Sequence, residues 1–545
     1  MLARATDLLT RLRSVEEDDR ARDGATDGEL MAEWKRSGVR FVASSPEMEA
    51  QYHRAVAELF GAIKTPGPIL HEGGVYQGCW LESTGTINAE LLSRFLPAVA
   101  ERTFASFAAH QREDGLLPYK VTPDGPAFAQ IQTVTPLARS VWTHYLLNGR
   151  PSDFLRTLYD AMARNDAWLA AWRDTRGTGG VEAFCTYDTG HDLSARFWHM
   201  PDSPLGNDPR HYDPDYPFLP LVAPDLTANV ACQRRYLSRI AAELGEDGDA
   251  WRDKARASEA ALFACCWDAD DGFFYDLDCA GRFVRVQSDV LLRVLACEIG
   301  DDAFFDAALR RYLLNTRKFF ARYPFTSLAL DDPRFDAAFD YNSWSGPSNF
   351  LSIIRAPHAF EAHHRHVELT WAMQPILGAL LRAPRFAQTL SPWTGDAGYT
   401  DTYSPAILCL LDFIERLSGI MPRPDGTLWF TGLVPAQMEH RDARHETGYA
   451  RRVDGRVFEL VNSGETSTTY RDGRELFSAP AGLRVVTDRS GTIAALIGMR
   501  AGGVTGTLRT PDASHAIDVA ANEQLDVVDG RFVSRRKPGL VQPTT

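Results

Sequence analysis

The sequence of 545 residues lacks features that several classes of protein require. It contains no run of about 18 apolar residues, so we expect no membrane-spanning helix. Its first residues carry charges early and include no apolar segment of signal-peptide length, so we expect no export signal. It has no Cys-x-x-Cys pair, and its eight cysteines show no paired spacing, which disfavours a zinc site and a disulfide framework. Scattered thiols are typical of a reducing compartment, and we therefore expect a cytoplasmic protein.

Basic residues are outnumbered by acidic residues. The 58 lysines and arginines face 72 acidic residues, which gives a formal net charge of −14. This charge repels phosphates, so neither nucleic acid nor an anionic membrane surface is an expected partner. It does not disfavour a small neutral carbohydrate. The 12 Trp, 17 Tyr and 29 Phe suffice for stacking on sugar rings, although most of them must pack in the core.

Helical periodicity dominates the chain up to about residue 435. Residues 88–112 repeat apolar positions with a period near 3.6, which predicts one long helix. Further helices are predicted over 136–148, 153–172, 225–244, 247–266, 287–298, 302–314, 347–361, 366–382 and 404–418. Long loops rich in Gly, Pro, Asp and aromatic residues separate them. Paired helices with such loops at one end suit a helical toroid whose loops build a pocket.

The pattern changes after about residue 436. Short segments rich in β-branched residues alternate with turns, and the pairs Asp454-Gly455 and Asp472-Gly473 are typical of hairpins. This predicts a small β-sandwich. We expect an N-terminal lead-in over 1–50, a helical catalytic domain over 51–435, a β-sandwich over 440–535 and a loose tail over 536–545.

The most informative segment covers residues 184–198. Gly190 gives a tight bend, Asp192 follows two positions later, and Arg196 four after that, with aromatic residues on both sides. A desolvated acid in such a loop stays protonated near neutral pH and can donate a proton. In the alternative interpretation, Asp192 caps a helix that begins near Leu193 and pairs with Arg196 one turn on.

Residues 189–197, Thr-Gly-His-Asp-Leu-Ser-Ala-Arg-Phe, resemble the S-G-x-D-x-S-x-R-(W/F) signature of trehalases. The same signature occurs in the related family 63 α-glucosidases and mannosylglycerate or glucosylglycerate hydrolases. These are inverting glycosidases built on an (α/α)6 barrel, and the signature's Asp is their general acid. The resemblance therefore implies that role for Asp192. Thr189 stands for the usual Ser and His191 for a usual Trp or Met.

Other segments that resemble these families follow in the same order along the chain. They are residues 78–83, 111–118, 225–229, 342–347 and 391–396. The resemblance therefore spans about residues 50–435, and it implies an (α/α)6 helical barrel, a mainly α fold, followed by the small β-sandwich.

The chain departs from these families at the catalytic base. Their base is a Glu about four residues before the late proline, and Gln388 stands there in this sequence. An amide cannot take a proton from water at neutral pH. Three explanations are open: another carboxylate acts as the base, the alignment is displaced by a few residues, or the chemistry differs. We predict Asp396 or Glu82 as the base; as alternatives, each merely caps a turn or helix.

Several further residues on these loops are predicted to bind substrate. Trp80 can stack on a sugar ring or belong to the core, and the amides of Gln130 and Gln132 suit sugar hydroxyls or are simply solvated. Asp188 either raises the pKa of Asp192 or is only a turn residue. The full set is Trp80, Tyr119, Gln130, Gln132, Asp188, His191, Arg196, Asn342, Trp344 and Gln388.

Together these features predict an inverting exo-glycoside hydrolase that cleaves a small α-linked glycoside, without a cofactor or metal. Two alternatives stay open: a non-hydrolytic or degenerate carbohydrate-binding barrel, which Gln388 favours, and a helical-toroid lyase or epimerase that uses His191 and Tyr187. An inverting enzyme needs a second carboxyl group roughly 6.5–9.5 Å from the acid. The sequence predicts neither the sugar nor the oligomeric state.

Overall fold

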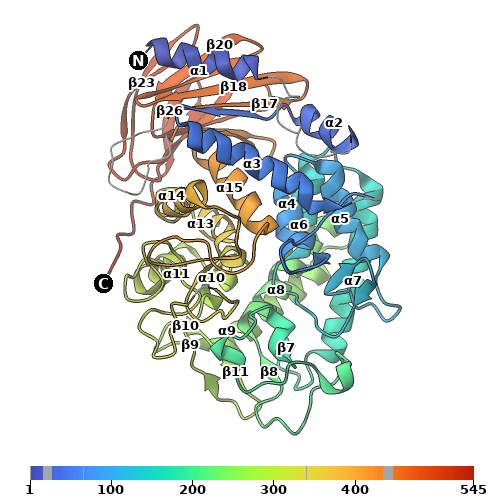
Figure 1. Cartoon of the computed structure of the whole chain (residues 1–545). Coiled ribbons are helices and arrows are strands. Elements are labelled where there is room, and N and C mark those ends of the chain that lie inside the picture. The colour runs from blue at the N-terminus through green and yellow to red at the C-terminus, as the bar shows by residue number, and fades with distance from the viewer. Residues whose placement is uncertain (1, 16–27, 65–66, 339, 434–445) are drawn as a thin grey trace.

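The computed structural model describes residues 2–15, 28–64, 67–338, 340–433 and 446–545. Helices fill the first three quarters of the chain and strands the last quarter (Figure 1). The longer helices are α1 Leu2–Ser14, α2 Gly28–Ser37, α3 Pro46–Ala62, α5 Pro97–Ala109, α6 Leu137–Leu147, α7 Ser152–Trp172, α8 Pro224–Glu243, α9 Asp249–Cys266, α14 His366–Arg382 and α15 Ser404–Ser418. Most of the predicted helices are thereby confirmed.

Two predicted helices are interrupted, and both breaks coincide with a proline. The expected helix 88–112 divides into α4 Ala89–Leu92 and α5, which begins at Pro97. The expected helix 347–361 divides into α12 Phe350–Ile353 and α13 Ala356–Ala362, with Pro357 in the first turn of α13. Proline has no N–H and clashes with the preceding turn, so it starts a helix more readily than it continues one.

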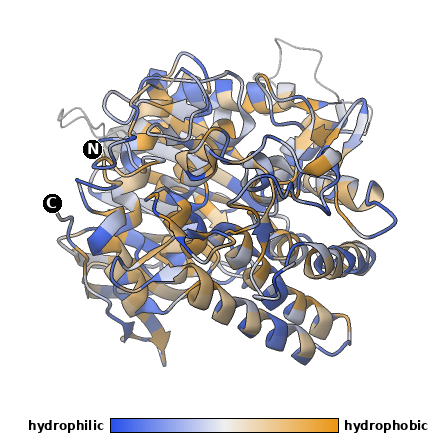
Figure 2. Ribbon diagram, turned by 90° about the horizontal axis from the view of Figure 1, so that it is seen from below, coloured by the Kyte–Doolittle hydropathy of each residue, from blue (hydrophilic) through white to orange (hydrophobic). Residues whose placement is uncertain are grey.

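Helix α15 is the most deeply placed element of the helical part. All of its residues are buried, and it packs against α3, α12 and α14. Most other helices carry both hydrophobic and hydrophilic residues, as Figure 2 shows, because only one face of each belongs to the core. No helix in the described ranges is both long enough and apolar enough to cross a membrane.

The strands of the last quarter, together with β1 from the early part of the chain, form two antiparallel sheets. The six-stranded sheet contains β15 Ile420–Pro422, β16 Leu428–Thr431, β21 Leu483–Thr487, β22 Ile493–Gly498, β25 Gln524–Val528 and β26 Arg531–Arg536. The seven-stranded sheet contains β1 Arg40–Ala43, β17 Thr447–Val453, β18 Arg456–Ser463, β19 Thr466–Arg471, β20 Arg474–Pro480, β23 Val504–Arg509 and β24 Ser514–Val519. The sheets face each other through Phe430, whose ring lies 5.7 Å from that of Phe458 and 5.5 Å from that of Phe477.

The two Asp-Gly hairpins are confirmed. Asp454 and Gly455 have φ values of 49° and 78°, and they connect β17 with β18. Asp472 and Gly473 have φ values of 50° and 81° between β19 and β20. Positive φ at both central residues matches the right-handed twist of the strands, which explains the choice of Asp-Gly.

The sheets extend beyond the range expected for them. The six-stranded sheet begins at Ile420 rather than near 440, because β16 pairs with β21. Strand β1 of the expected lead-in pairs with β17 (Figure 1). Their register places Phe41 opposite Tyr449. The tail is not loose: Val541 is fully buried, and Thr544 exchanges backbone hydrogen bonds with Leu314 and Thr316. Strands of three or four residues are too short for periodicity to reveal.

The contact of Phe430 with both sheets leads to a stability prediction. Phe430→Ala should lower the free energy of unfolding by about 3–5 kcal/mol, because it leaves a cavity between the sheets. Urea unfolding followed by fluorescence would measure the change. Val533→Ala, at a side chain that is 49% exposed on β26, is the control and should shift the midpoint little. Equal midpoints for both variants would contradict this account of the sandwich core.

Candidate active site

A small cavity in the helical part brings together residues from six separate segments. The lining residues are Glu72, Tyr76, Trp80, Glu82, Ser83, Gln132, Gly190, Asp192, Leu351, Gln388 and Tyr403. Five of the predicted site residues are among them. A larger cavity of about 640 Å³ lies where the helices meet the six-stranded sheet, but none of the predicted catalytic residues lines it. The smaller cavity is therefore the candidate active site.

Gly190 shapes the loop that carries Asp192. Its φ is +68°, in the left-handed region that favours glycine. A Cβ atom at this position would lie 1.8 Å from Glu82 Oε2. The glycine thus provides the bend and also the space that the Glu82 carboxylate occupies.

Asp192 is half-buried and lines the cavity. Asn342 Nδ2 donates a hydrogen bond to Asp192 Oδ2 at 2.9 Å. The pKa of Asp192 is raised to about 7, first by burial and then by the negative charge of Glu82, against the opposing effect of the hydrogen bond from Asn342. A carboxyl group with this pKa is protonated in a large fraction of molecules at neutral pH, as a general acid must be.

The helix-capping interpretation of Asp192 is wrong. Leu193 has a φ of 60°, and the short 3₁₀ turn Ala195–Phe197 is capped by the Ser194 side chain. Arg196 binds other carboxylates. The Asp192 carboxyl group therefore points to the cavity without a guanidinium partner among the ion pairs of the described residues.

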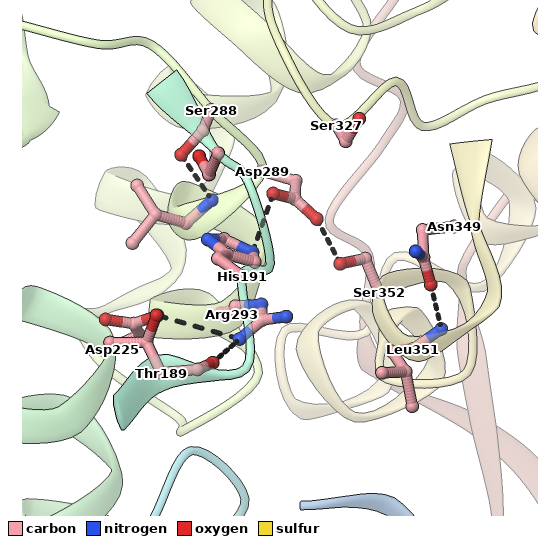
Figure 3. A network of polar contacts seen from close by, with 12 residues as sticks. Thr189, His191, Asp225, Ser288, Asp289, Arg293, Ser327, Asn349, Leu351 and Ser352 are labelled. Carbon is pink, nitrogen blue, oxygen red and sulfur yellow. Dashed lines mark hydrogen bonds and ion pairs between the residues drawn. The ribbon is translucent and has the colours of Figure 1, made fainter. Parts of the chain in front are cut away.

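Arg196 and His191 support the loop from behind and do not line the cavity. The buried guanidinium of Arg196 forms paired hydrogen bonds with Asp225, at 2.9 and 3.0 Å, and with Asp276, at 2.8 Å each. It also donates to His191 Nδ1 at 2.7 Å. His191 Nε2 lies 3.1 Å from Asp289 Oδ1 (Figure 3). Burial and the nearby arginines lower the pKa of His191 well below its usual range, so its ring is neutral.

Two arginines that sequence reasoning missed hold Glu82 in place. Glu82 Oε1 lies 2.9 Å from Arg355 Nη2 and 3.1 Å from Arg293 Nη2. Arg293 also donates to the Thr189 backbone oxygen at 2.7 Å and lies 3.7 Å from Asp225 (Figure 3). The available signal was an arginine within an apolar run, Val290-Leu-Leu-Arg-Val-Leu, where a buried cation requires an anionic partner.

Trp344 lies in the same supporting layer. Its ring centroid is 4.5 Å from that of His191 and 4.8 Å from the guanidinium carbon of Arg293. It is buried, and it is not among the residues that line the cavity. The structure therefore places Trp344 behind the cavity wall.

Two of the predicted acids are placed away from the cavity. Asp188 is buried; it binds Arg173 at 2.6 Å and accepts the N–H groups of Phe184 and Ile131 at 2.7 and 3.1 Å. These contacts agree with the alternative interpretation of Asp188 as a turn residue. Asp396 is exposed and accepts a hydrogen bond from Thr394 Oγ1 at 2.7 Å, which is again an interaction within a turn.

The other side of the cavity carries groups that suit a sugar. Trp80 is half-buried and makes ring contacts of 5.7 Å with both Tyr76 and Tyr119. Gln132 donates to Gln130 Oε1 at 3.1 Å. Gln132 Oε1 and Trp80 Nε1 are buried without a hydrogen-bond partner in the described part of the chain. Buried polar atoms normally find partners, and the hydroxyls of a bound sugar can serve both.

A chain of hydrogen bonds connects Asp192 with Gln388. Asn342 Nδ2, already bonded to Asp192, lies 3.0 Å from the hydroxyl of Tyr76, and that hydroxyl donates to Gln388 Oε1 at 2.8 Å. The amide at position 388 therefore faces the cavity, as the resemblance implied for this position. Sequence reasoning missed Glu72, Tyr76 and Tyr403. A carboxylate next to Gly73-Gly74, shortly before Trp80, was the available signal.

A family model described as the mannosylglycerate hydrolase MGH1-like glycoside hydrolase domain matches residues 76–404, more than half of the chain. The chain belongs to this family. The matched MGH1-like domain contains Asp192, Asn342 and Gln388, and ends at the first residue of α15. A search of curated proteins found no match.

Solved structures of glycoside hydrolases share the fold of this MGH1-like chain. A family 63 mannosylglycerate hydrolase from Thermus thermophilus matches with a TM-score of 0.57 and 19% identity, over 66% of this chain and 99% of that one. Neutral trehalase from Saccharomyces cerevisiae matches with a TM-score of 0.50 and 12% identity, over 65% and 74%. A structure named sialidase matches with a TM-score of 0.59 and 15% identity, over 88% of this chain and 44% of that one.

The position of Gly190 leads to a prediction with a matched control. Gly190→Ala should lower hydrolytic activity about 100-fold, because the new methyl group displaces Glu82 and shifts the loop of Asp192. Gly177→Ala carries nearly the same backbone strain, since its φ is +65°, but has no atom within 4 Å of the added Cβ. Activity assays and melting temperatures of the two variants separate the steric effect from the strain. Equal activities would show that the contact with Glu82 does not matter.

Proposed function

We propose that the chain is an inverting exo-glycoside hydrolase that acts on a small α-linked glycoside, with Asp192 as general acid. The observation that carries this proposal is the state of the Asp192 carboxyl group. It has no arginine ion-pair partner among the described residues, its pKa is raised to about 7, and it lies in a cavity with groups suited to sugar hydroxyls. Membership of a glycoside hydrolase family supports the reaction class.

The proposed architecture is an (α/α)6 barrel with the cavity at the end that carries the long loops. The run of helices from α3 to α15 and the fold shared with mannosylglycerate hydrolase and trehalase support it. The two sheets form the proposed C-terminal domain.

The residues that line the cavity are suited to binding an uncharged sugar ring. No lysine or arginine is among the lining residues of the described chain, whereas glutamine, tyrosine, serine and tryptophan are. These groups bind hydroxyls and stack on pyranose faces. The names of the similar proteins indicate mannosylglycerate and trehalose for the first substrate panel. Trehalose is uncharged and fits this lining, whereas mannosylglycerate carries a carboxylate and tests whether a cationic partner is needed.

The proposed reaction begins with protonation of the glycosidic oxygen by Asp192. The hydrogen bond from Asn342 occupies Asp192 Oδ2, so the proton to be donated resides on Oδ1. A second carboxylate must activate water on the opposite face of the sugar. Of the two predicted candidates, Asp396 is exposed in a turn and Glu82 Oε1 is bound by two arginines. Neither arrangement favours a base.

A non-hydrolytic carbohydrate-binding barrel is the second candidate function, because Gln388 lines the cavity at the position of the family's base. It predicts tight sugar binding without turnover. The lyase or epimerase alternative has less support, because both ring nitrogens of His191 face protein groups away from the cavity.

The role of Asp192 is tested by substitution. Asp192→Asn should retain the fold and sugar binding but reduce turnover of mannosylglycerate, trehalose or aryl α-glycosides about 10²–10⁴-fold. Turnover of the panel and the anomer first released, followed by NMR, would be measured. Near-normal turnover by Asp192→Asn would refute the assignment, and release of the α-anomer would refute inversion.

The raised pKa of Asp192 gives a pH prediction. The value of kcat/KM should fall as pH rises through about 7, because Asp192 then loses the proton that it donates. Asn342→Ala removes a hydrogen bond that lowers this pKa, so the basic limb should move about one unit upward. Thr394→Ala, in the exposed turn of Asp396, is the control. A basic limb that stays in place in Asn342→Ala would refute the assignment of that limb to Asp192.

A further inference from the structure

Glu72 is a cavity carboxylate that takes no part in the proton donation assigned to Asp192. It is buried and lines the same cavity as Asp192 and Gln388. Its backbone is fixed on both sides, because its N–H donates to the Gly78 oxygen at 2.9 Å and its oxygen accepts from the Ser404 N–H at 2.8 Å. The loop that follows also lies close to other backbone, since a Cβ at Gly73 would fall 2.0 Å from the Thr402 oxygen.

The immediate partners of the Glu72 carboxylate are hydroxyl groups. Ser83 Oγ donates to Glu72 Oε2, and the Tyr403 hydroxyl forms a further hydrogen bond with the carboxylate. No lysine or arginine forms an ion pair with Glu72 among the residues that the structure describes. Glu72 differs in this respect from Glu82, whose Oε1 atom binds two guanidinium groups.

This environment leaves Glu72 able to accept a proton near neutral pH. Burial raises the pKa of Glu72 to about 7, although the hydrogen bonds from Ser83 and Tyr403 lower it. A general base works best when its pKa lies near the working pH. A carboxylate held by two arginines has its lone pairs engaged and is a poorer acceptor.

We propose that Glu72 is the general base of this enzyme and replaces the carboxylate that Gln388 cannot supply, an inference that rests on the proposed hydrolase function. Gln388 keeps a positioning role, because its Oε1 accepts the hydrogen bond of Tyr76. Tyr76 and Glu72 belong to one loop, closed by a bridge between Gly73 and Tyr76. The proposed base and its neighbours therefore come from residues 72–83, the segment that also supplies Trp80.

The balanced step involves one water molecule and two proton transfers. Glu72 takes a proton from the water while the water oxygen forms a bond to the anomeric carbon. The electron pair of the breaking glycosidic bond goes to the leaving oxygen, which receives the proton of Asp192. The products are the inverted sugar and the free alcohol. Glu72 is then protonated and Asp192 ionised, and exchange with solvent restores both.

The first experiment uses α-D-glucopyranosyl and α-D-mannopyranosyl fluoride as substrates. Fluoride leaves without a proton donor, so Asp192→Asn should keep most of its activity on the fluoride that the wild type hydrolyses. Glu72→Gln should lose about 10²–10⁴-fold on it, because activation of water is still required. The acidic limb of kcat/KM, which the wild type should show below about pH 7, should be absent in Glu72→Gln.

Azide distinguishes a base from a residue that only holds the loop. Azide is already a nucleophile, so it should restore activity to Glu72→Ala and form the β-glycosyl azide. Glu82→Ala should not respond, because its loss disturbs Arg293 and Arg355 rather than the activation of water. Glu33→Gln is the control for burial: the pKa of this buried glutamate is also raised by burial, but it binds the Ala98 N–H outside the cavity. Its activity should be unchanged.

The outcomes separate the two proposals. If the wild type hydrolyses neither the fluorides nor the panel of α-glycosides, the hydrolase proposal fails, and the role of Glu72 fails with it. If the wild type is active and Glu72→Gln keeps its rate and acidic limb, only the role of Glu72 is overturned. Azide rescue of Glu82→Ala in place of Glu72→Ala would assign the base to Glu82. If the Glu72 variants do not fold, Glu72→Asp replaces them and should lose rate but retain the acidic limb; an unchanged rate would refute the role.

Discussion

The pairing of buried charges behind the cavity is the constraint on which the site depends. Arg196, Arg293 and Arg355 are almost fully buried, and a buried guanidinium without an anion is very costly. Their partners come from distant parts of the chain: Glu82, Asp225 and Asp276. Each pair fixes two segments relative to each other. Together they hold the Gly190 loop, and with it Asp192, against the early loop that carries Glu82 and Trp80.

This pairing contributes to the difference in pKa between Asp225 and the pair Asp192 and Glu72. At Asp276, burial outweighs the same Arg196 guanidinium and raises the pKa. Asp225 forms ion pairs with Arg196 and Arg293, and these lower its pKa to about 2 despite burial. Asp192 and Glu72 are bound by an amide and by hydroxyl groups, and burial raises the pKa of both to about 7. The arginines thus serve the framework. Among the carboxylates that line the cavity in the described chain, Asp192 and Glu72 have no guanidinium ion pair, which fits their proposed roles in proton transfer.

Much of the fold could be predicted because its signals are local. The period of the long helices and the Asp-Gly pairs at 454–455 and 472–473 depend on neighbouring residues, and both are found in the structure. The signature around Asp192 likewise identified the loop of the cavity. Helix breaks at Pro97 and Pro357 had a local signal too, which the apolar period concealed.

The rest of the site depends on contacts between distant segments. Glu72 is recognisable as part of the cavity only once Ser83, Tyr403 and Gln388 surround it. Asp188 and Arg196 stand close to Asp192 in the sequence, yet each faces a buried partner away from the cavity. Proximity along the chain therefore assigned too many residues of the Asp192 loop to the cavity and missed residues from distant segments, such as Glu72.

The pairing of β1 with β17 has a consequence for how the protein is made. These strands are about 400 residues apart in the sequence, and α1 packs on the sheet that they complete. During synthesis the first strand leaves the ribosome long before its neighbour exists. Its unpaired edge must stay protected from other chains throughout that time. The seven-stranded sheet can consequently be completed only after the whole helical part between β1 and β17 has been synthesised.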